Sequence, residues 1–209
     1  SAPTDSAPAT GQASPSSTVT STFPPLQDVP EVCDLLPESL TTRLAPLSKS
    51  APGVAKDGYG AKRKDCVWDQ KGYNMKNGYN ESRSISLKVN VFPDHESALD
   101  DADFMWDSMR DESGQSKGDP YNTKYGEIKQ LADLGDGAYA IYNRHTVRNR
   151  ATAWVFVVRG NTTIDVRFHG SDNKGREINS DADSRPVAED VLLKGAEEVA
   201  AEALKNVGS

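Results

Sequence analysis

The 209-residue chain is predicted to form one α+β domain, with a largely antiparallel sheet, helices packed on one face, and a disordered tail ahead of it. A segment at 84–92 alternates between apolar and polar residues, as a half-buried strand does. Three apolar runs follow residue 137 at short spacing, which is typical of strands joined by hairpins. Two segments, after Asp94 and after Pro186, carry an apolar stripe at helical spacing. Helices and hairpins in this order favour a sandwich of helices on a sheet.

Residues 1–28 are predicted to be a disordered stalk, and residues 29–209 the folded domain. Up to about Gln27 the chain consists mainly of Ser, Thr, Ala, Pro and Gly, with almost no charge. Such a segment cannot bury enough apolar surface to offset the entropy lost on ordering. We favour a stalk over a terminus without a role, because this composition is typical of tethers that cross a cell wall.

The first half of the domain is predicted to contain a short helix, a loop and two strands. The helix, at 37–45, begins with a proline, where the missing N–H costs nothing, and stops before Pro46. A polar loop at 57–64 then leads into a short strand that starts at Cys66. In the strand at 84–92 the apolar face is formed by Ile85, Leu87, Val89 and Val91.

A longer helix is predicted to follow Pro93, with Asp94 as its N-cap. Its core-facing stripe is Ala98, Ala102, Met105, Trp106 and Met109. Further strands are expected at 128–134, 138–143, 151–159 and 162–168, with Gly160–Asn161 as the connector of the last hairpin. A final helix that reaches Asn206 is predicted to bury Val187, Val191, Ala196, Val199, Ala203 and Leu204.

The overall charge of the chain excludes some classes of partner. There are 31 acidic and 24 basic residues, which gives a net charge of −7. An acidic chain is a poor nucleic-acid binder, because that affinity depends on basic residues that neutralise phosphates. No run approaches the ~20 apolar residues that span a bilayer, so we expect membrane attachment only through an added anchor.

The two cysteines, Cys33 and Cys66, are expected to form a disulfide. Half a metal site is the less favoured interpretation, because there is no CxxC pair and the three histidines are scattered. Two inert buried thiols are the other alternative. A bridge that closes this loop would stabilise the fold by about 3–4 kcal/mol. No metal or other cofactor is expected.

Three short segments resemble the DUF3558-type lipoproteins of actinobacteria: 32–40 around the first cysteine, 66–68 around the second, and the 134–139 glycine turn. The similarity covers roughly 29–206, and the two cysteines correspond to the family's pair. It implies a PsbP/Mog1-like sandwich in a secreted lipoprotein, anchored to the outer face of the cytoplasmic membrane. The acylated cysteine would precede Ser1 and is absent from this chain, so the anchor is inferred. The family supplies no catalytic residues to carry over.

The common catalytic signatures are absent from the sequence. There is no GxSxG elbow, no Walker A sequence and no GxGxxG. His95 and Glu96 begin an HExxH-like pattern, but no second histidine follows one turn later. We therefore expect a protein that is not an enzyme.

Two basic-aromatic clusters are candidate partner-binding residues. The first comprises Lys62, Arg63, Lys64, Lys71, Tyr73, Lys76, Tyr79 and Arg83, and the second comprises Arg144, His145, Arg148 and Arg150. Their cations could contact carboxylates or phosphates, and the tyrosines could stack on sugar rings. The alternative is that they are solvated loop charges that balance nearby acids.

These observations favour a non-catalytic, extracytoplasmic lipoprotein domain that binds an envelope or membrane protein and regulates a sensor or an assembly. Cell-wall polymer is a second candidate partner. The alternative function is a carrier for a small hydrophobic ligand or a cell-wall glycan, held between sheet and helices. The candidate pocket residues are then Trp68, Trp106 and Trp154.

Overall fold

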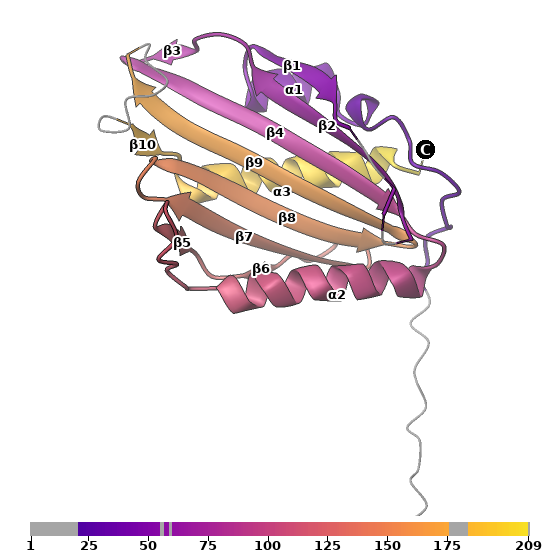
Figure 1. The fold of residues 1–209 in the computed structure, drawn as a ribbon. Coiled ribbons are helices and arrows are strands. Elements are labelled where there is room, and N and C mark those ends of the chain that lie inside the picture. Colours follow the sequence, from indigo (N-terminus) through magenta and orange to yellow (C-terminus); the bar gives the residue numbers. More distant parts are fainter. Residues whose placement is uncertain (1–20, 55–56, 59, 176–183, 209) are drawn as a thin grey trace, which may run out of the picture.

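The computed structural model describes residues 21–54, 57–58, 60–175 and 184–208. Within these ranges a ten-stranded antiparallel sheet has the order β1-β2-β4-β9-β8-β7-β5, with β3, β6 and β10 as short additions (Figure 1). The strands are β1 (Ser48–Pro52), β2 (Lys62–Gln70), β3 (Met75–Lys76), β4 (Tyr79–Val91), β5 (Thr123–Tyr125), β6 (Lys129–Gln130), β7 (Gly137–His145), β8 (Arg150–Arg159), β9 (Thr162–Lys174) and β10 (Arg185–Pro186). The predicted α+β class is confirmed.

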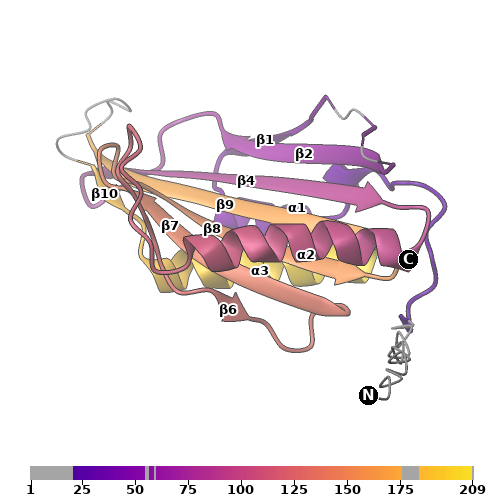
Figure 2. The same ribbon diagram turned by 60° about the horizontal axis from the view of Figure 1, so that its bottom comes forward.

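The helical elements lie on both faces of the sheet, which corrects the prediction of one helical face. They are the 3-10 turn η1 (Val32–Asp34), α1 (Glu38–Leu44), α2 (His95–Glu112) and α3 (Glu189–Asn206). Helices α1 and α3 and the turn η1 pack on one face, which we call the α3 face, and α2 packs on the opposite α2 face (Figure 2).

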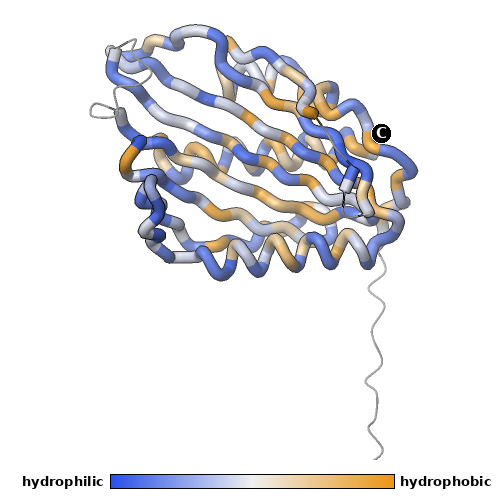
Figure 3. Tube along the Cα trace, in the orientation of Figure 1, coloured by the Kyte–Doolittle hydropathy of each residue, from blue (hydrophilic) through white to orange (hydrophobic). Residues whose placement is uncertain are grey.

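The reason for two covered faces lies in β8. Its run at 153–158 is continuously apolar rather than alternating, so both sides of the strand need cover. Val155 and Val157 contribute to the core under α3, whereas Trp154 and Phe156 contribute to the core under α2. In Figure 3 the hydrophobic colour is continuous along the later part of β8, while β4 alternates.

The α3 face holds the larger core. The strand residues Ile85, Leu87 and Val89 are fully buried there, as predicted. Helix α3 approaches the sheet closely at Gly195, where a Cβ would lie 2.5 Å from the Phe168 ring. A larger residue at position 195 would therefore push the helix away from the sheet.

The long α2 begins as predicted, because the Asp94 carboxylate accepts a hydrogen bond of 2.8 Å from the Ser97 N–H. The register of α3 differs from the prediction. The helix starts at Glu189 instead of Pro186, and Val191, predicted to be buried, is 52% exposed. Leu192 and Leu193 take its place in the core. Within the described ranges, none of the helices has the length and apolar character needed to cross a membrane.

The predicted strand at 128–134 is present only as the two residues of β6, because Asp133 and Gly135 adopt positive φ and the chain turns there. The last three residues of the predicted loop at 57–64 belong to β2, which begins at Lys62. Strands β1, β3, β5 and β10 were not predicted.

Residues 21–28, predicted to belong to the stalk, pack on the domain. The Arg159 guanidinium lies 4.5 Å from the centre of the Phe23 ring. The Asn161 side chain accepts from the Leu26 N–H at 2.8 Å and donates to the Leu26 carbonyl at 2.9 Å. The Ser21 hydroxyl donates to the Asp136 carboxylate at 2.6 Å, so the packed region includes residue 21 and does not begin at residue 29. The rest of the predicted stalk, 1–20, lies outside the described residues.

The sheet has two distinct ends, which the long pairing of β4 with β9 separates. The two strands pair in register from Tyr79–Lys174 to Val91–Thr162. We call the end where residues 21–31 meet the sheet the entry end, and the opposite end, with the β7–β8 hairpin, the hairpin end (Figure 1). At about 3.3 Å per residue, the two ends are roughly 40 Å apart along β4 and roughly 30 Å apart along β8.

Candidate partner-binding surface

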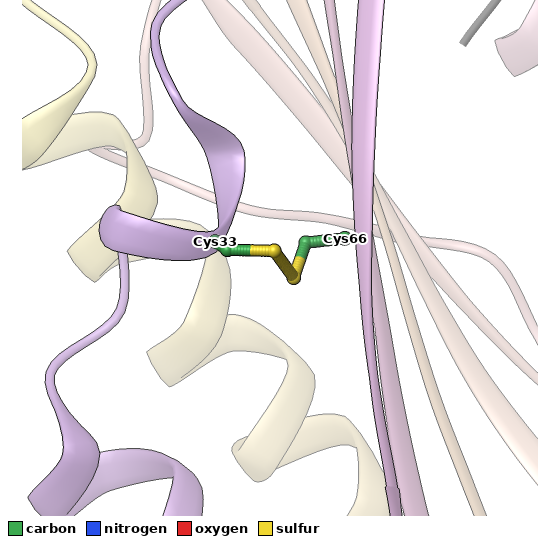
Figure 4. Close-up of a disulfide and its surroundings, with 2 residues drawn as sticks. All are labelled: Cys33 and Cys66. Carbon is green, nitrogen blue, oxygen red and sulfur yellow. A yellow bond between two sulfur atoms is a disulfide. The ribbon is translucent and has the colours of Figure 1, made fainter. Parts of the chain in front are cut away.

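The predicted disulfide is present. Cys33 of η1 and Cys66 of β2 are bonded, with 5.2 Å between their Cα atoms (Figure 4). Cys66 is fully buried against the α3-face core. The bond joins the amino-terminal turn to a strand in the interior of the sheet, and a buried disulfide is a structural group.

Three cations of the first predicted cluster lie at the entry end and have partners there. The Lys62 ammonium donates to the Gln27 carbonyl at 2.9 Å and lies 3.6 Å from the Asp28 carboxylate. Lys64 pairs with Glu31. The Arg63 Nε donates to the Asn90 side chain at 2.8 Å. Two of these three cations therefore fasten segment 27–31 to β2.

The other members of the first cluster lie at or near the hairpin end. The Arg83 guanidinium, nearly buried, donates to the Asp172 carboxylate at 2.9 Å. Lys76 lies 3.6 Å from Glu81. Lys71 and Tyr73 are exposed in the loop between β2 and β3, and the Tyr79 ring carries the Arg185 guanidinium at 4.0 Å. The structure thus divides the first cluster, because the length of β2 separates its two halves.

The second cluster lies on the β7–β8 hairpin. Lys124 of β5 joins it, because Lys124 pairs in register with Arg144. We call Lys124, Arg144, Arg148 and Arg150 the cationic tip. The tip is at the same end of the sheet as Arg83, since β8, β9 and β4 align Ala151, Gly170 and Arg83. Sequence analysis missed Lys124, whose place at the tip depends on the pairing of β5 with β7.

A three-layer stack holds part of the tip in place. The Arg148 guanidinium lies 4.6 Å from the centre of the Tyr121 ring. That ring in turn stacks on the His145 imidazole, at 5.1 Å between centroids and 15° between planes. Burial lowers the pKa of His145, with the nearby Arg150 and Arg148 acting in the same direction and Asp119 opposing them. The imidazole is therefore neutral at pH 7, and the positive charge of the stack belongs to Arg148.

The cations of the tip are gathered in one place, and they lack acidic partners in the described part of the chain. Among the described residues, no carboxylate lies within 4.0 Å of the charged groups of Lys124, Arg144, Arg148 or Arg150. Elsewhere the paired cations are Arg43, Lys62, Lys64, Lys76, Arg83, Lys88, Arg110, Lys117, Lys129, Arg167, Arg185 and Lys205. On a chain with a net charge of −7, four unpaired cations in one place form a distinct positive surface.

The three candidate pocket tryptophans do not meet. Trp68 packs on the α3 face, whereas Trp106 and Trp154 pack on the α2 face. All three are core residues, with 4%, 8% and 8% of their surface exposed. The Trp106 Nε1 donates to the Phe156 carbonyl at 3.4 Å, and the Arg167 guanidinium covers Trp154 at 4.7 Å.

The groove of the α2 face lies elsewhere, beside the first half of α2 near the entry end. It has a volume of about 620 Å³ and is lined by Arg63, Phe92, Ser97, Asp100, Asp101, Phe104 and Met105. Phe104 is 72% exposed, on the side of α2 that the predicted apolar stripe left polar. Asp101 accepts a hydrogen bond of 3.0 Å from the Thr163 hydroxyl, and burial raises its pKa. An aromatic residue off the stripe was the sequence signal for this site.

One histidine is held neutral inside the sheet. Burial, together with the nearby Arg167, lowers the pKa of His169 to about 4. The Thr152 hydroxyl lies 2.8 Å from its Nδ1 atom. Over the described part of the chain, no three His, Cys, Asp or Glu side chains come together as metal ligands would.

No family model matches the chain, and no curated protein sequence matches it. Among solved structures, the fold is similar to the crystal structure of the extracellular domain of PknH from Mycobacterium tuberculosis, with a TM-score of 0.57. The two chains are 13% identical, and the match covers 84% of this chain and 93% of the other. At this identity the likeness shows a shared fold, so this α+β architecture is one that a solved extracellular domain also adopts.

Proposed function

We propose that this chain is the non-catalytic, extracytoplasmic domain of an envelope lipoprotein of the DUF3558 type, and that it binds another envelope protein through the cationic tip. Such binding would regulate a sensor or an assembly. The segment ahead of residue 21 would connect the entry end to a lipid anchor on the outer face of the cytoplasmic membrane.

One observation carries this proposal: the amino-terminal segment is held at one end of the sheet, and the cationic tip lies at the other. The entry end holds the amino-terminal segment through ion pairs at Lys62 and Lys64 and through hydrogen bonds at Asn161. The hairpin end, roughly 30 Å away along β8, presents the cationic tip, whose members have no acidic partner among the described residues. A domain attached at one end and free at the other exposes the free end to partners.

The disulfide and the fold support the extracytoplasmic location. Disulfides persist in oxidising compartments and are rare in the reducing cytosol. The bridge between Cys33 and Cys66 is buried and structural, so a reduced form would lack a constraint on which the fold depends. The solved neighbour with the same fold is an extracellular domain.

Photo-crosslinking in cells that express the full-length protein tests the proposal. A photo-reactive amino acid is placed at Val147, which is 48% exposed between the cations of the tip, or at Val54, which is 89% exposed in the loop after β1. We expect a discrete protein adduct from position 147 and none from position 54. Equal capture from both positions, or none from either, would contradict binding at the tip.

The groove beside α2 favours a second candidate function, the binding of a small hydrophobic ligand. Its volume of about 620 Å³ lies in the range of ligand sites, and Phe92, Phe104 and Met105 give it an apolar lining. Native mass spectrometry of protein purified from its own host should then show a bound mass, which Phe104→Ser removes. A spectrum of bare protein alone would reject this candidate.

A further inference from the structure

Two cations of the tip face each other on neighbouring strands. Lys124 of β5 and Arg144 of β7 are directly opposite in the antiparallel register. Side chains in such positions have Cβ atoms about 5 Å apart, and like charges there destabilise the pair of strands. Within the described ranges, neither side chain has a carboxylate partner. An anion placed between them would remove this repulsion.

The remaining two cations extend the positive surface around the hairpin. Arg144 is opposite Ala151, and Ala151 belongs to the core of the α3 face. The next pair, His145 and Arg150, therefore lies on the α2 face. Arg148 lies in the turn, fixed against Tyr121. The charges therefore surround a projecting hairpin and do not form a line along a groove. A side chain that is already ordered loses little entropy on binding.

Apolar surface accompanies the charge. Val147 is 48% exposed and Tyr121 is 36% exposed, and both lie among the cations. Protein interfaces are enriched in Tyr and Arg around an apolar centre. Binding of a polyphosphate-like polymer depends mainly on the cations and gives no use to an exposed valine. The composition of the tip thus fits a protein partner better than a charged polymer.

We infer that the cationic tip docks against an acidic surface of the partner protein. Carboxylates of the partner lie between Lys124 and Arg144 and beside Arg148 and Arg150, while an apolar side chain covers Val147. This inference rests on the proposed function and adds the chemistry of the partner's surface to it.

Charge reversal within the crosslinking experiment tests the inference. The double variant Lys124→Glu/Arg144→Glu is compared with Lys49→Glu/Lys194→Glu, which makes the same change in net charge at exposed lysines away from the tip. The tip variant should lower the yield of the adduct from position 147 at least about ten-fold, and the matched variant less than about two-fold. A tip variant with the full yield overturns the acidic surface but leaves the proposed binding function standing. If no protein is captured even with the unreversed tip, the proposed function itself fails.

A binding assay with the purified full chain separates a protein partner from a polymer. Fluorescent poly-glutamate and polyphosphate chains of equal length serve as probes. A further poly-glutamate chain carries one leucine in every four residues. We expect this leucine-containing chain to bind most tightly. Val147→Ser should weaken its binding and leave the binding of the other two probes unchanged. Tightest binding of polyphosphate, unaffected by Val147→Ser, would overturn the inference in favour of a polymeric ligand.

Discussion

The entry end of the sheet and the cationic tip at the opposite end use the same residue types in opposite ways. At the entry end, Lys62 and Lys64 contact acids from the segment that they hold in place. In the tip, Lys124 and Arg144 face each other, and neither has an acidic partner among the residues that the structure describes. In the sequence, nothing distinguishes the cations of the entry end from those of the tip. A cation whose partner lies within the chain has a structural role, whereas the proposed function assigns the cations of the tip to a partner protein.

The two ends also differ in what stabilises them. The entry end depends on a disulfide and on partly buried hydrogen bonds to the amino-terminal segment. The hairpin end depends on strand pairing, a partly buried neutral histidine and aromatic stacking. A change that removes an interaction of one end should therefore loosen that end before the other. Four predictions follow from this difference, in order of decreasing effect.

Removal of the disulfide should have the largest effect, and it should act at the entry end. The double variant Cys33→Ser/Cys66→Ser is expected to lower the free energy of unfolding by about 4 kcal/mol, because the unfolded chain loses its closed loop. Urea denaturation measures this change. Hydrogen exchange should rise first over 29–70. Faster exchange at the hairpin end than at the entry end would break the comparison.

Acid should loosen the hairpin half of the sheet. The pKa of about 4 for His169 in the fold lies below the ordinary value of 6.5, so the unfolded chain binds more protons between these pH values. The contribution of neutral His169 to the free energy of unfolding is therefore fully present above pH 6.5. It decreases by about 3 kcal/mol as the pH falls towards 4. Urea denaturation at several pH values, compared with His169→Gln, isolates the effect. An identical pH dependence in the two proteins would rule out this role of His169.

Loss of the Asn161 side chain should release the amino-terminal segment. Asn161 is 3% exposed, and its amide donates to the carbonyls of Leu26 and Phe92 while it accepts from the Leu26 N–H. Asn161→Ala is expected to cost about 2–3 kcal/mol, since buried backbone groups lose their partners. Asn161→Asp, which keeps only the acceptor, is the matched variant. Proteolysis near residue 26 should accelerate, while cleavage in 145–150 should not.

A single charge reversal at the tip should have the smallest effect on stability, and of the opposite sign. Lys124→Glu places an acid opposite Arg144 and should raise the free energy of unfolding by about 0.5 kcal/mol. Lys49→Glu, at an exposed edge strand, should leave it nearly unchanged. Thermal denaturation compares the two. A destabilised Lys124→Glu protein would mean that the two cations do not repel each other in the fold.

Much of the fold followed from local sequence patterns. The alternation at 84–92 and the cap at Asp94 depend on neighbouring residues, and the structure confirms both. The sequence also contained the correction to the helical faces, because the continuous apolar run at 153–158 cannot be covered from one side alone. Strand β1 had no such signal, since an edge strand of sequence Ser-Lys-Ser-Ala-Pro needs no apolar face.

The candidate surface was only partly predictable. Arg144 to Arg150 are close in sequence, so their clustering on a hairpin could be expected. Lys124 belongs with them only because β5 pairs with β7. The separation of Lys62 from Arg83 likewise depends on strand direction and on partners that lie far away in the chain. Residue types predicted the chemistry of the surface, and only the strand order shows which charges meet.

The thirteen-residue pairing of β4 with β9 has a mechanical consequence. If residue 21 is pulled while a partner holds the β7–β8 hairpin, the tension runs nearly parallel to the strands. Hydrogen bonds along the ladder then share the load in shear and do not open one after another, as a zipper would. The bond from Cys33 to Cys66 passes the pull directly into β2, and so bypasses the weaker packing of the amino-terminal turn. Under such a load, the ladder and the disulfide would resist unfolding together.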